Sequence, residues 1–407
     1  MLTHKNIHFY RYDDVSKYDP VDEPAAQPAN AERDGCVKEL NILVVGGGIG
    51  GLTSAVALRR AGFTVTIVEK DPDWSVYGVG IIQQSNVIRA MADLGLIDDY
   101  LEAGFGFDQV EIYIPTGQRV AVIPSPKLVA DYPANVGIGR RALHQVLGDR
   151  AIRAGAEIRL GVTVVTLDDD GAGVDVSFAD GSSGRYDIVI GADGLYSQMR
   201  DYVAPEAQAP VFVGQGVWRY NFPRPADVTS LCAYDGAIGV GLVPLSHTLM
   251  YMYVTTPERE NRRYPREGLA AEMRAKLAGQ PPRIAELVDQ ISDDDAVVYK
   301  PLECLMLEGP WHRGRVVLMG DAVHATTPHL GQGAGMAIED SIVLAEELAA
   351  HDLPESAFKA FRARRIDRCR YIVEQSRAIS FGQTGQGPRL DQGKVTHEMF
   401  AETAKPI

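Results

Sequence analysis

Residues 41–69 of this chain read NILVVGGGIGGLTSAVALRRAGFTVTIVE and decide the fold. The run at 42–45 is short, apolar and ended by glycine, which is typical of a strand buried on both faces. Residues 51–61 have helical composition and end at Gly62, a favourable helix stop, and residues 64–69 are a second β-branched run. The stretch therefore predicts a strand–helix–strand unit with parallel strands and a right-handed crossover.

Three glycines in this stretch indicate a nucleotide-binding turn. Gly46, Gly48 and Gly51 satisfy G-x-G-x-x-G between the strand and the helix. The first permits the tight turn, the second lets a pyrophosphate approach the backbone, and the third lets helix and strand pack closely. Glu69 ends the second strand, where a carboxylate accepts hydrogen bonds from a ribose hydroxyl. The unit predicts a dinucleotide pocket but does not choose between FAD and NAD.

Length, charge and cysteine content narrow the class of protein. The 407 residues favour two domains with a large buried core. The formal net charge of −14 argues against a nucleic-acid partner or an anionic membrane. No apolar run approaches the roughly 18 residues that cross a bilayer. The four cysteines stand far apart without a C-x-x-C pair, so we expect neither a disulfide framework nor a metal site, and a cytoplasmic location fits best.

Residues 187–200 form the first of two further strand-to-helix segments. A strand at 187–190 is followed by an acidic–glycine turn that contains Asp193 and Gly194. Ligands collect at the carboxyl ends of strands in open α/β sheets, so Asp193 is a candidate binding residue. The segment taken alone also fits an ordinary turn in which Asp193 caps the next helix.

Residues 315–335 form the second segment. A buried strand ends at Gly320 and Asp321, and the run at 328–335, Pro-His-Leu-Gly-Gln-Gly-Ala-Gly, opens another helix. Such closely spaced glycines let backbone N–H groups approach a flat anionic ligand, and the helix dipole favours negative charge there. A reduced isoalloxazine, anionic around N1 and C2=O, suits such a site.

These three segments, in this order and at ordinary separations, resemble the single-component class A FAD-dependent aromatic hydroxylases. That family contains the p-hydroxybenzoate, salicylate and 6-hydroxynicotinate hydroxylases and FAD-dependent urate hydroxylase. The resemblance rests on the glycine fingerprint with Glu69, the Asp-Gly pair at 193–194 and the Gly-Asp pair at 320–321, and it covers roughly residues 41–380. It implies FAD as the bound cofactor.

The resemblance also implies how individual residues hold FAD. Glu69 would bind the adenosine ribose, Asp321 the ribityl chain or pyrophosphate, and Asp193 the pyrophosphate. Arg140, at an R-x-x-L-H helix start, would contact FAD, and the loop around residues 78–86 would pass near the isoalloxazine ring. The full set of expected cofactor-binding residues is Gly46, Gly48, Ile49, Gly50, Gly51, Glu69, Lys70, Gly80, Arg140, Asp193, Asp321, Pro328, Gly331, Gly333, Ala334 and Gly335.

The expected fold class is α/β: a Rossmann-type FAD-binding domain, an antiparallel-sheet substrate domain and a C-terminal helix. The expected parts are an N-terminal arm at 1–40, a discontinuous FAD-binding domain at 41–104, 136–204 and 306–350, a substrate domain at 105–135 and 205–305, and a C-terminal helix and tail at 351–407.

Local patterns add detail to these parts. Two short strands around Pro115–Gln118 read as a hairpin, and the Val-, Tyr- and Gly-rich stretch at 211–256 as an antiparallel sheet. Residues 268–290 have helical composition, and residues 356–380 predict a long basic amphipathic helix. The Gly- and Gln-rich tail beyond Phe381 is expected to be irregular.

One dinucleotide fingerprint, without a second one or a nearby cysteine pair, implies that NADH or NADPH binds transiently, reduces the flavin and leaves. The resemblance then implies that reduced flavin and O2 form a C4a-hydroperoxide, which hydroxylates an electron-rich aromatic or N-heteroaromatic ring. The enzyme is thus expected to act on a small ring substrate, as a monomer or homodimer. The alternative is another flavin-dependent oxidoreductase, of reductase type, on the same fold; the W-x-W-x-I-P motif of halogenases is absent.

Four residues are candidates for the substrate side. Arg219, between Trp218 and Tyr220, would pair with an anionic substrate or shield the flavin, although an ordinary ion pair fits as well. Tyr251 falls where urate hydroxylases carry a pocket tyrosine, although half-buried tyrosines usually serve packing. His247 is a possible acid or base, and His329 is another.

Two positions depart from particular members of the family. Ile82 stands where 6-hydroxynicotinate hydroxylases place a histidine, and Gly239 stands where urate hydroxylases carry a substrate-binding arginine. These departures argue against those two activities in their strict form.

Overall fold

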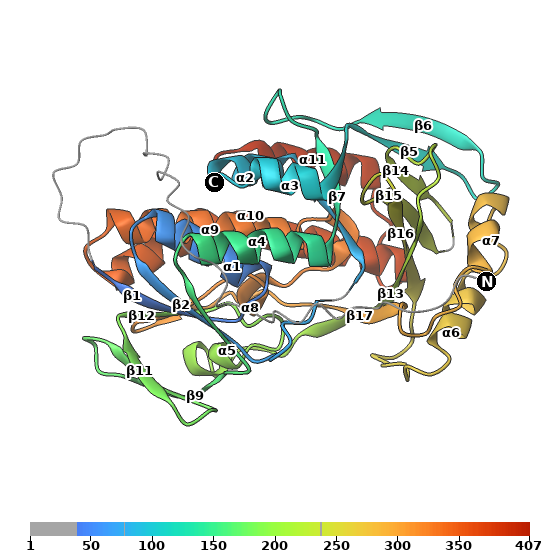
Figure 1. Ribbon diagram of the computed structural model, residues 1–407. Helices are drawn as coiled ribbons and strands as arrows, with labels where there is room; N and C mark the ends of the chain where they lie inside the picture. The colour runs from blue at the N-terminus through green and yellow to red at the C-terminus, as the bar shows by residue number, and fades with distance from the viewer. Residues whose placement is uncertain (1–38, 77, 237) are drawn as a thin grey trace, which may run out of the picture.

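The computed structural model describes residues 39–76, 78–236 and 238–407 (Figure 1). All but the last two residues of the expected N-terminal arm, 1–40, lie outside these ranges. The described chain contains a six-stranded sheet, a seven-stranded sheet and two three-stranded sheets, together with helices. The expected α/β class, with a Rossmann-type unit and an antiparallel sheet, is confirmed.

The six-stranded sheet is built around the strand–helix–strand unit. Its spatial order is β18 (His312–Arg313), β19 (Val316–Leu318), β12 (Ile188–Gly191), β1 (Asn41–Val45), β2 (Thr64–Glu69) and β8 (Glu157–Leu160). β1 runs parallel to both β2 and β12, so Val45 lies between Val68 and Gly191. The carboxyl ends of these strands therefore meet at one edge of the sheet, which places the three glycine-containing turns together.

Four long helices pack together on one side of this sheet, as Figure 1 shows. They are α1 (Ile49–Arg60), α4 (Arg140–Arg153), α9 (Gly333–Ala350) and α10 (Pro354–Thr384). α1 contacts both α4 and α9, and α9 contacts α10. The long C-terminal helix expected at 356–380 is confirmed as α10. On the other side lie α5 (Gln198–Val203) and the small sheet of β9 (Val164–Asp169), β10 (Val174–Phe178) and β11 (Ser183–Tyr186).

The seven-stranded sheet forms the wall opposite the glycine-containing turns. Its spatial order is β17 (Val298–Cys304), β13 (Val211–Pro223), β16 (Leu249–Pro257), β15 (Gly239–Pro244), β14 (Leu231–Tyr234), β5 (Gln109–Tyr113) and β6 (Arg119–Pro124). β14 and β5 are parallel, and the other neighbours are antiparallel. The expected hairpin and antiparallel sheet are thus confirmed.

The two faces of this sheet differ because side chains alternate along each strand. One face carries buried side chains such as Trp218, Phe222 and Met252, which pack with Met273 and Ile284 in a core of their own. These last two belong to α6 (Leu269–Lys276) and α7 (Pro282–Val288). The neighbouring residues along each strand, such as Arg219 and Tyr253, point to the other face, which lines the cavity described below.

A third sheet joins the two larger ones. It consists of β3 (Gly80–Gln84), β7 (Asn135–Gly139) and β4 (Gly104–Phe107), with α2 (Ser85–Asp93) and α3 (Ile97–Ala103) between β3 and β4. Gly137 of β7 lies against β15, because a Cβ there would come within 2.0 Å of the Pro244 carbonyl oxygen. This contact holds the sheet of β3, β7 and β4 close to the seven-stranded sheet.

The helical composition at 268–290 is confirmed, and the stretch forms two helices separated around Gly279 and the following prolines, which stop a helix. One local prediction needs correction. The tail beyond Phe381 was expected to be irregular, but residues 392–404 form a further helix, α11 (Gln392–Ala404). Its buried positions recur every fourth residue, a short amphipathic pattern that the preceding Gly- and Gln-rich stretch obscures.

Candidate active site

The turn after β1 is shaped by two glycines that no other residue can replace. Gly46 has φ +111°, and a Cβ on it would lie 2.5 Å from the Ala192 carbonyl oxygen. A Cβ on Gly51 would lie 1.9 Å from the Gly46 carbonyl oxygen. These contacts hold β1, β12 and the start of α1 close together, as the fingerprint predicts.

Gly48 plays a different part, because it borders open space. A Cβ at Gly48 would meet no atom within 4 Å, and Gly48, Ile49 and Gly50 line a large cavity. Gly48 is the N-cap of α1, and its position supplies no side-chain hydrogen bond to the helix. The first amides of α1 are therefore available to an anion, as a dinucleotide pyrophosphate requires.

Glu69 and Lys70 lie at the same end of the cavity. The Glu69 carboxylate accepts hydrogen bonds from the Gly47 amide at 2.8 Å and the Asp71 amide at 2.9 Å. Each oxygen therefore has one backbone donor, and lone pairs remain on both for a further donor from the cavity.

Two residues beside Glu69 were given no role by the sequence. The Gly47 carbonyl oxygen lies 2.9 Å from both Trp74 Nε1 and His144 Nε2. Because a carbonyl only accepts, Nε2 of His144 carries the proton, and burial lowers the pKa of this imidazole so that it stays neutral. The two rings also meet edge to face at 4.8 Å. The R-x-x-L-H pattern contained His144, but only the fold brings it to Gly47.

The turn after β19, which contains Gly320 and Asp321, borders the same cavity as the turn after β1. Gly320 has φ +60°, and Asp321 starts the short helix α8 (Asp321–His324) with its side chain open to the cavity. Enclosure by the surrounding protein raises the pKa of the Asp321 carboxyl, against the opposing influence of His324 and Arg140. Arg140, at the start of α4, lines the same cavity.

The segment from Pro328 to Ala334 continues this wall. Pro328 opens the short 3-10 helix η2 (Pro328–Leu330), and Gly331, with φ +68°, ends it. Pro328, Gly331, Gly333 and Ala334 all line the cavity. Gly335 does not; it is buried, and a Cβ there would come within 2.9 Å of Val87 on α2.

Asp193 lies apart from the cavity lining. Its carboxylate accepts hydrogen bonds from Ser197 Oγ at 2.5 Å and from the amides of Gln198 and Met199 at 2.8 and 3.1 Å. These contacts hold the first turn of α5, but the N-cap of that helix is Ser197, so Asp193 supports the helix start without being its cap. Its neighbours Gly194 and Leu195 do line the cavity.

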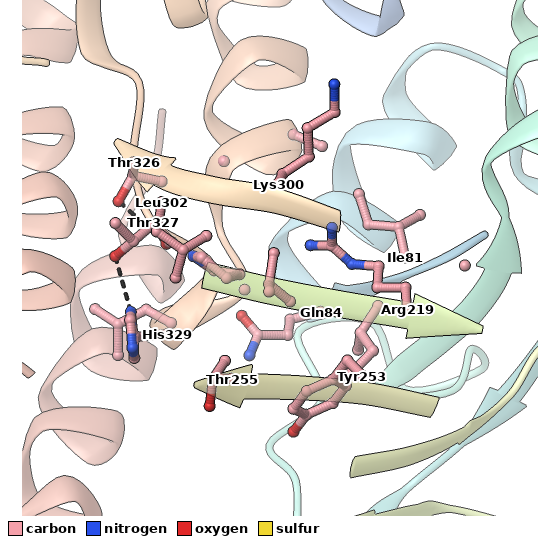
Figure 2. Close-up of a pocket in the computed structure, with 18 of the residues that line it drawn as sticks. Ile81, Gln84, Arg219, Tyr253, Thr255, Lys300, Leu302, Thr326, Thr327 and His329 are labelled. Carbon is pink, nitrogen blue, oxygen red and sulfur yellow. Dashed lines mark hydrogen bonds between the residues drawn. The ribbon is translucent and has the colours of Figure 1, made fainter. Parts of the chain in front are cut away.

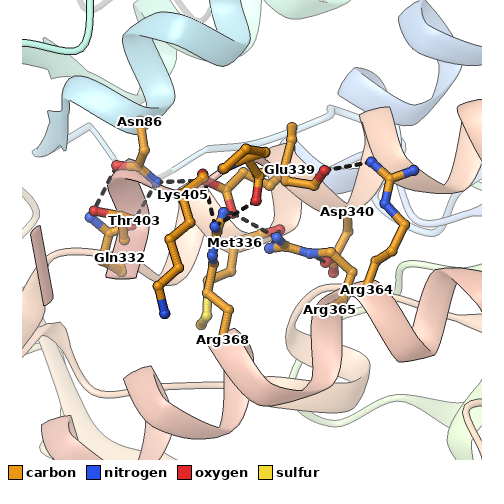
Figure 3. Close-up of polar contacts among 12 residues, drawn as sticks. Asn86, Gln332, Met336, Glu339, Asp340, Arg364, Arg365, Arg368, Thr403 and Lys405 are labelled. Carbon is orange, nitrogen blue, oxygen red and sulfur yellow. Dashed lines mark hydrogen bonds and ion pairs between the residues drawn. The ribbon is translucent and has the colours of Figure 1, made fainter. Parts of the chain in front are cut away.

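A buried network of charged side chains holds the turn that contains Gly320. Figure 3 shows its Asp340 and Arg365. Asp340 Oδ2 accepts the Gly320 amide at 2.9 Å and lies 2.6 Å from His324 Nε2, while Arg365 Nε donates to Asp340 Oδ1 at 2.8 Å. Burial disfavours the Asp340 carboxylate, but His324 and Arg365 outweigh it and lower the pKa of Asp340 to about 2. Likewise burial opposes the charged His324, and Asp340 raises the pKa of this imidazole.

The network extends to the glycine-rich loop through Asn86. Asn86 Nδ2 donates to Gln332 Oε1 at 2.9 Å, and Gln332 Nε2 returns a bond to Asn86 Oδ1 at 3.1 Å. Asn86 also donates to Glu339, which pairs with Arg368 of α10 at 3.1 Å (Figure 3). This chain of contacts fixes the loop between Pro328 and the start of α9 relative to α2 and α10.

The candidate substrate residues lie on the cavity face of the seven-stranded sheet. Arg219 of β13 stands opposite Tyr253 of β16 (Figure 2). Tyr251 lies two residues before Tyr253 on β16 and also lines the cavity. Burial and the like charge of Arg140 lower the pKa of Arg219 to about 10, against the influence of Tyr251. Among the described residues, no carboxylate forms an ion pair with Arg219. It therefore presents a charged guanidinium to the cavity.

Tyr251 is buried and faces the start of β3. A Cβ on Gly80 would come within 2.3 Å of the Tyr251 ring, so this glycine makes room for it. Burial raises the pKa of Tyr251, with Arg219 and Arg140 opposing, and its hydroxyl stays protonated at neutral pH. Both Gly80 and Tyr251 line the cavity.

The two histidines differ in position. His247 is exposed in the turn between β15 and β16, outside the cavity lining, with its ring 5.7 Å from that of Phe105. His329 lines the cavity, and its Nδ1 lies 2.8 Å from Thr327 Oγ1 (Figure 2). Burial lowers the pKa of His329 to about 4, so the ring is neutral at pH 7.

These walls enclose one cavity of about 2130 Å³. It joins the glycine-containing turns to the Arg219 face of the sheet, although the two come from distant parts of the chain. Open space at Gly48, exposed helix amides and the Glu69 carboxylate fit the diphosphate and ribose of a dinucleotide.

None of the helices in the described ranges combines the length and the apolar composition of a membrane span.

Comparison with known proteins agrees with this geometry. Residues 39–376 match the family described as FAD binding domain. A putative FAD-dependent monooxygenase YetM of Bacillus subtilis is 32% identical over 349 residues, which are 83% of this chain and 92% of that protein. The 2-heptyl-3-hydroxy-4(1H)-quinolone synthase of Pseudomonas aeruginosa is 31% identical over 354 residues, covering 85% and 90%. The crystal structure of Klebsiella pneumoniae HpxO complexed with FAD and uric acid matches with a TM-score of 0.78 and 25% identity, covering 90% and 93%.

Proposed function

Because this chain belongs to the FAD binding domain family and is a class A flavoprotein hydroxylase, we propose that NADH or NADPH reduces its FAD and that O2 then hydroxylates an electron-rich aromatic or N-heteroaromatic ring. The chain is an FAD-dependent monooxygenase. The proposal adds the reductant, the oxygen source and the type of substrate.

One observation carries the proposal. A single cavity has glycine-containing turns suited to a dinucleotide on one side and Arg219, Tyr251 and Tyr253 on the other. A cation that forms no ion pair within the described part of the chain and two aromatic rings are groups that hold a flat, anionic ring by charge and by stacking. The relatives named for a quinolone and the structure with uric acid both concern N-heteroaromatic compounds, which supports this substrate class.

The residues that would hold FAD follow from the geometry above. The amides at the start of α1 would take the pyrophosphate, Glu69 a ribose, and the loop at Gly331–Ala334 the flavin ring. When bound there, FAD would supply the two-electron redox chemistry that links NAD(P)H to O2. In the balanced reaction, ring–H, O2, NAD(P)H and a proton give ring–OH, water and NAD(P)⁺.

Arg219 and Tyr251 prepare the ring for attack by an electrophilic oxygen. The guanidinium stabilises a ring bearing negative charge, which is the electron-rich form. The protonated Tyr251 hydroxyl donates a hydrogen bond to a ring oxygen or nitrogen and so fixes its orientation. Ile81, Ile82 and Leu302 line the same space and keep water away from the reacting atoms.

The test is oxygen incorporation by the purified yellow protein. NADH or NADPH oxidation is measured with a panel of phenols, hydroxypyridines, quinolones and purines, and products are analysed by mass spectrometry under 18O2. We expect at least one ring to accelerate flavin reduction and to gain one labelled oxygen. A matched Arg219→Met enzyme should load FAD normally and lose most of this stimulation.

Two results contradict the proposal. If reductant is consumed and a product forms without 18O, the enzyme is of reductase type. If no ring in the panel binds, accelerates reduction or gains oxygen, the assignment of an aromatic substrate is wrong.

A further inference from the structure

We propose that the ring substrate carries a long aliphatic substituent, which lies along the outer half of the seven-stranded sheet. The inference rests on the proposed function, since it assumes that the ring binds beside Arg219. The first reason is the reach of the cavity. Its lining does not stop at Arg219 but continues to Leu231, Val110 and Ile123 on the outer strands of the sheet.

The strand register shows the course of this lining. Across five neighbouring strands, Arg219 lies opposite Tyr253, Tyr253 opposite Gly241, Gly241 opposite Ala233, and Ala233 opposite Ile112. Paired residues in a sheet point to the same face. The row therefore runs straight from the guanidinium to the edge hairpin, over four strand spacings or about 19 Å.

A second row, two residues along, repeats the pattern. It starts at Tyr251, and further out Leu231 lies opposite Val110 and Val110 opposite Ile123. All four of these side chains line the cavity. The face is thus cationic and aromatic on β13 and β16, and wholly aliphatic on β14, β5 and β6.

Gly241 leaves an open passage between the part of the face on β13 and β16, which carries Arg219 and the tyrosines, and the aliphatic part on β14, β5 and β6. A Cβ on Gly241 would come within 2.2 Å of the Tyr253 ring, so that ring covers the glycine. The aromatic ring therefore forms the floor of the passage between Arg219 and the aliphatic half. A larger residue at 241 would force the ring upward into the cavity.

The helix α11 supplies further lining for the same cavity. Thr396, Phe400 and Ala404 recur at intervals of four residues, which places them on one helix face, and all three line the cavity. Gln392, at the start of α11, lines a small adjoining cavity with Asp235 at the end of β14. The helix thus begins next to the outer half of the sheet.

The apolar surface at the hairpin edge is otherwise unexplained. Ile123 is 51% exposed, yet its side chain lies on the cavity face next to Val110. Exposed apolar side chains in a row that continues into a catalytic cavity fit an apolar part of the substrate. A chain of methylene or isoprene units, without charge, is the chemistry that these residues match.

The test uses two matched series, n-alkylphenols and 2-n-alkyl-4(1H)-quinolones, each from the bare ring to the nonyl compound. Affinity for the oxidised FAD-bound enzyme is measured from the change in flavin absorbance, and KM from turnover. We expect Kd and KM to fall by roughly two- to fourfold per methylene group until the outer half is filled.

Two neighbouring exposed residues provide the variant and its control. Ile123→Asn places a polar group on the cavity face, whereas Val122→Asn changes the next residue of the same strand, opposite Glu111 on the other face. We expect Ile123→Asn to flatten the chain-length dependence and leave the bare ring unaffected, and Val122→Asn to behave as the parent. Ala233→Trp, placed mid-way, should exclude long chains while the bare ring still binds.

Each outcome separates this inference from the proposed function. If bare and alkylated rings are oxygenated with the same KM, the inference is overturned and the hydroxylase proposal stands. If Kd falls with chain length but nothing gains oxygen, the aliphatic site stands and the proposed reaction fails. If both asparagine variants change the oligomeric state in light scattering and neither changes chain-length dependence, the hairpin edge is an interface between copies, and the inference is overturned.

Discussion

Gly48→Ala should abolish tight FAD binding while leaving the fold intact. The structure separates the effect on FAD binding from the effect on folding. A Cβ at Gly48 would meet no protein atom within 4 Å and would point into open space at the cavity. The backbone there, with φ −81°, suits alanine. Alanine is a poorer N-cap than glycine by less than about 1 kcal/mol, and reduced freedom of the unfolded chain returns about 0.4–1 kcal/mol. The apoprotein should therefore keep its stability within about 1 kcal/mol.

The effect on FAD is larger. The added methyl group would stand between the pyrophosphate and the amides of α1. Losing two charge-assisted hydrogen bonds at about 1.5 kcal/mol each costs about 3 kcal/mol, which is roughly a 100-fold weaker Kd. The assay is flavin-fluorescence titration of the apoprotein, with urea unfolding of the same samples.

Two neighbouring glycines serve as controls. Gly50 also lines the cavity, but a Cβ there would lie 3.4 Å from Ala337 and 3.6 Å from Met319, so the methyl group of Gly50→Ala packs against protein and should weaken FAD binding less than that of Gly48→Ala. Gly51→Ala should fail to fold, because its Cβ would lie 1.9 Å from the Gly46 carbonyl oxygen. If Gly48→Ala binds FAD as tightly as the parent, the pyrophosphate does not approach this turn and the reasoning is wrong.

Three further predictions concern the walls of the site. Arg219→Met should lower kcat/KM for an anionic ring by about 10- to 100-fold, the worth of one charge-assisted hydrogen bond, without loss of bound FAD. Asp340→Asn should destabilise the protein by about 3–5 kcal/mol in urea unfolding, because it takes the buried carboxylate away from His324 and leaves Arg365 paired with Glu339 alone. In the parent, the Asp340 contribution is present above about pH 4 and is lost as pH falls towards 2, since folding lowers the pKa of this carboxyl from 3.8 to about 2. Deleting residues 405–407 removes the carbonyl oxygens that Arg368 binds at 2.9 Å, so we expect α11 to loosen and more H2O2 to be released per NAD(P)H consumed.

Controls distinguish these results from general damage. Arg219→Lys should recover part of the activity, and equal kinetics for Arg219→Met and the parent would exclude a role in binding the ring. Glu374→Gln, on the exposed face of α10, should change stability by less than about 0.5 kcal/mol. An Asp340→Asn protein as stable as this control would show that the buried network contributes nothing. Unchanged H2O2 release after the deletion would separate α11 from the reacting centre.

Local chemistry explains why much of the cofactor side could be predicted from the sequence. Gly46 and Gly51 are required by backbone conformation and contacts within a few residues or between adjacent strands, and such constraints are visible as a motif. The same holds for the apolar run of β1 and the long helix α10. The motif at Asp193 was less informative, because an aspartate at a strand end serves equally to cap a helix, and in the fold its carboxylate holds α5.

The sequence by itself thus determined the strand–helix–strand unit and the dinucleotide turn, because these depend on short-range sterics. The class of enzyme followed from the resemblance of the three motifs to a known family. The tertiary structure alone decided which side chains of the seven-stranded sheet face the glycine-containing turns across the cavity. The row from Arg219 to Ile112 depends on five strands, including the parallel pairing of β14 with β5 across more than a hundred residues. The support of Gly320 by Asp340, and the helix α11, likewise come from contacts between distant segments. Such pairings are selected by burial over the whole molecule, so no local pattern records them.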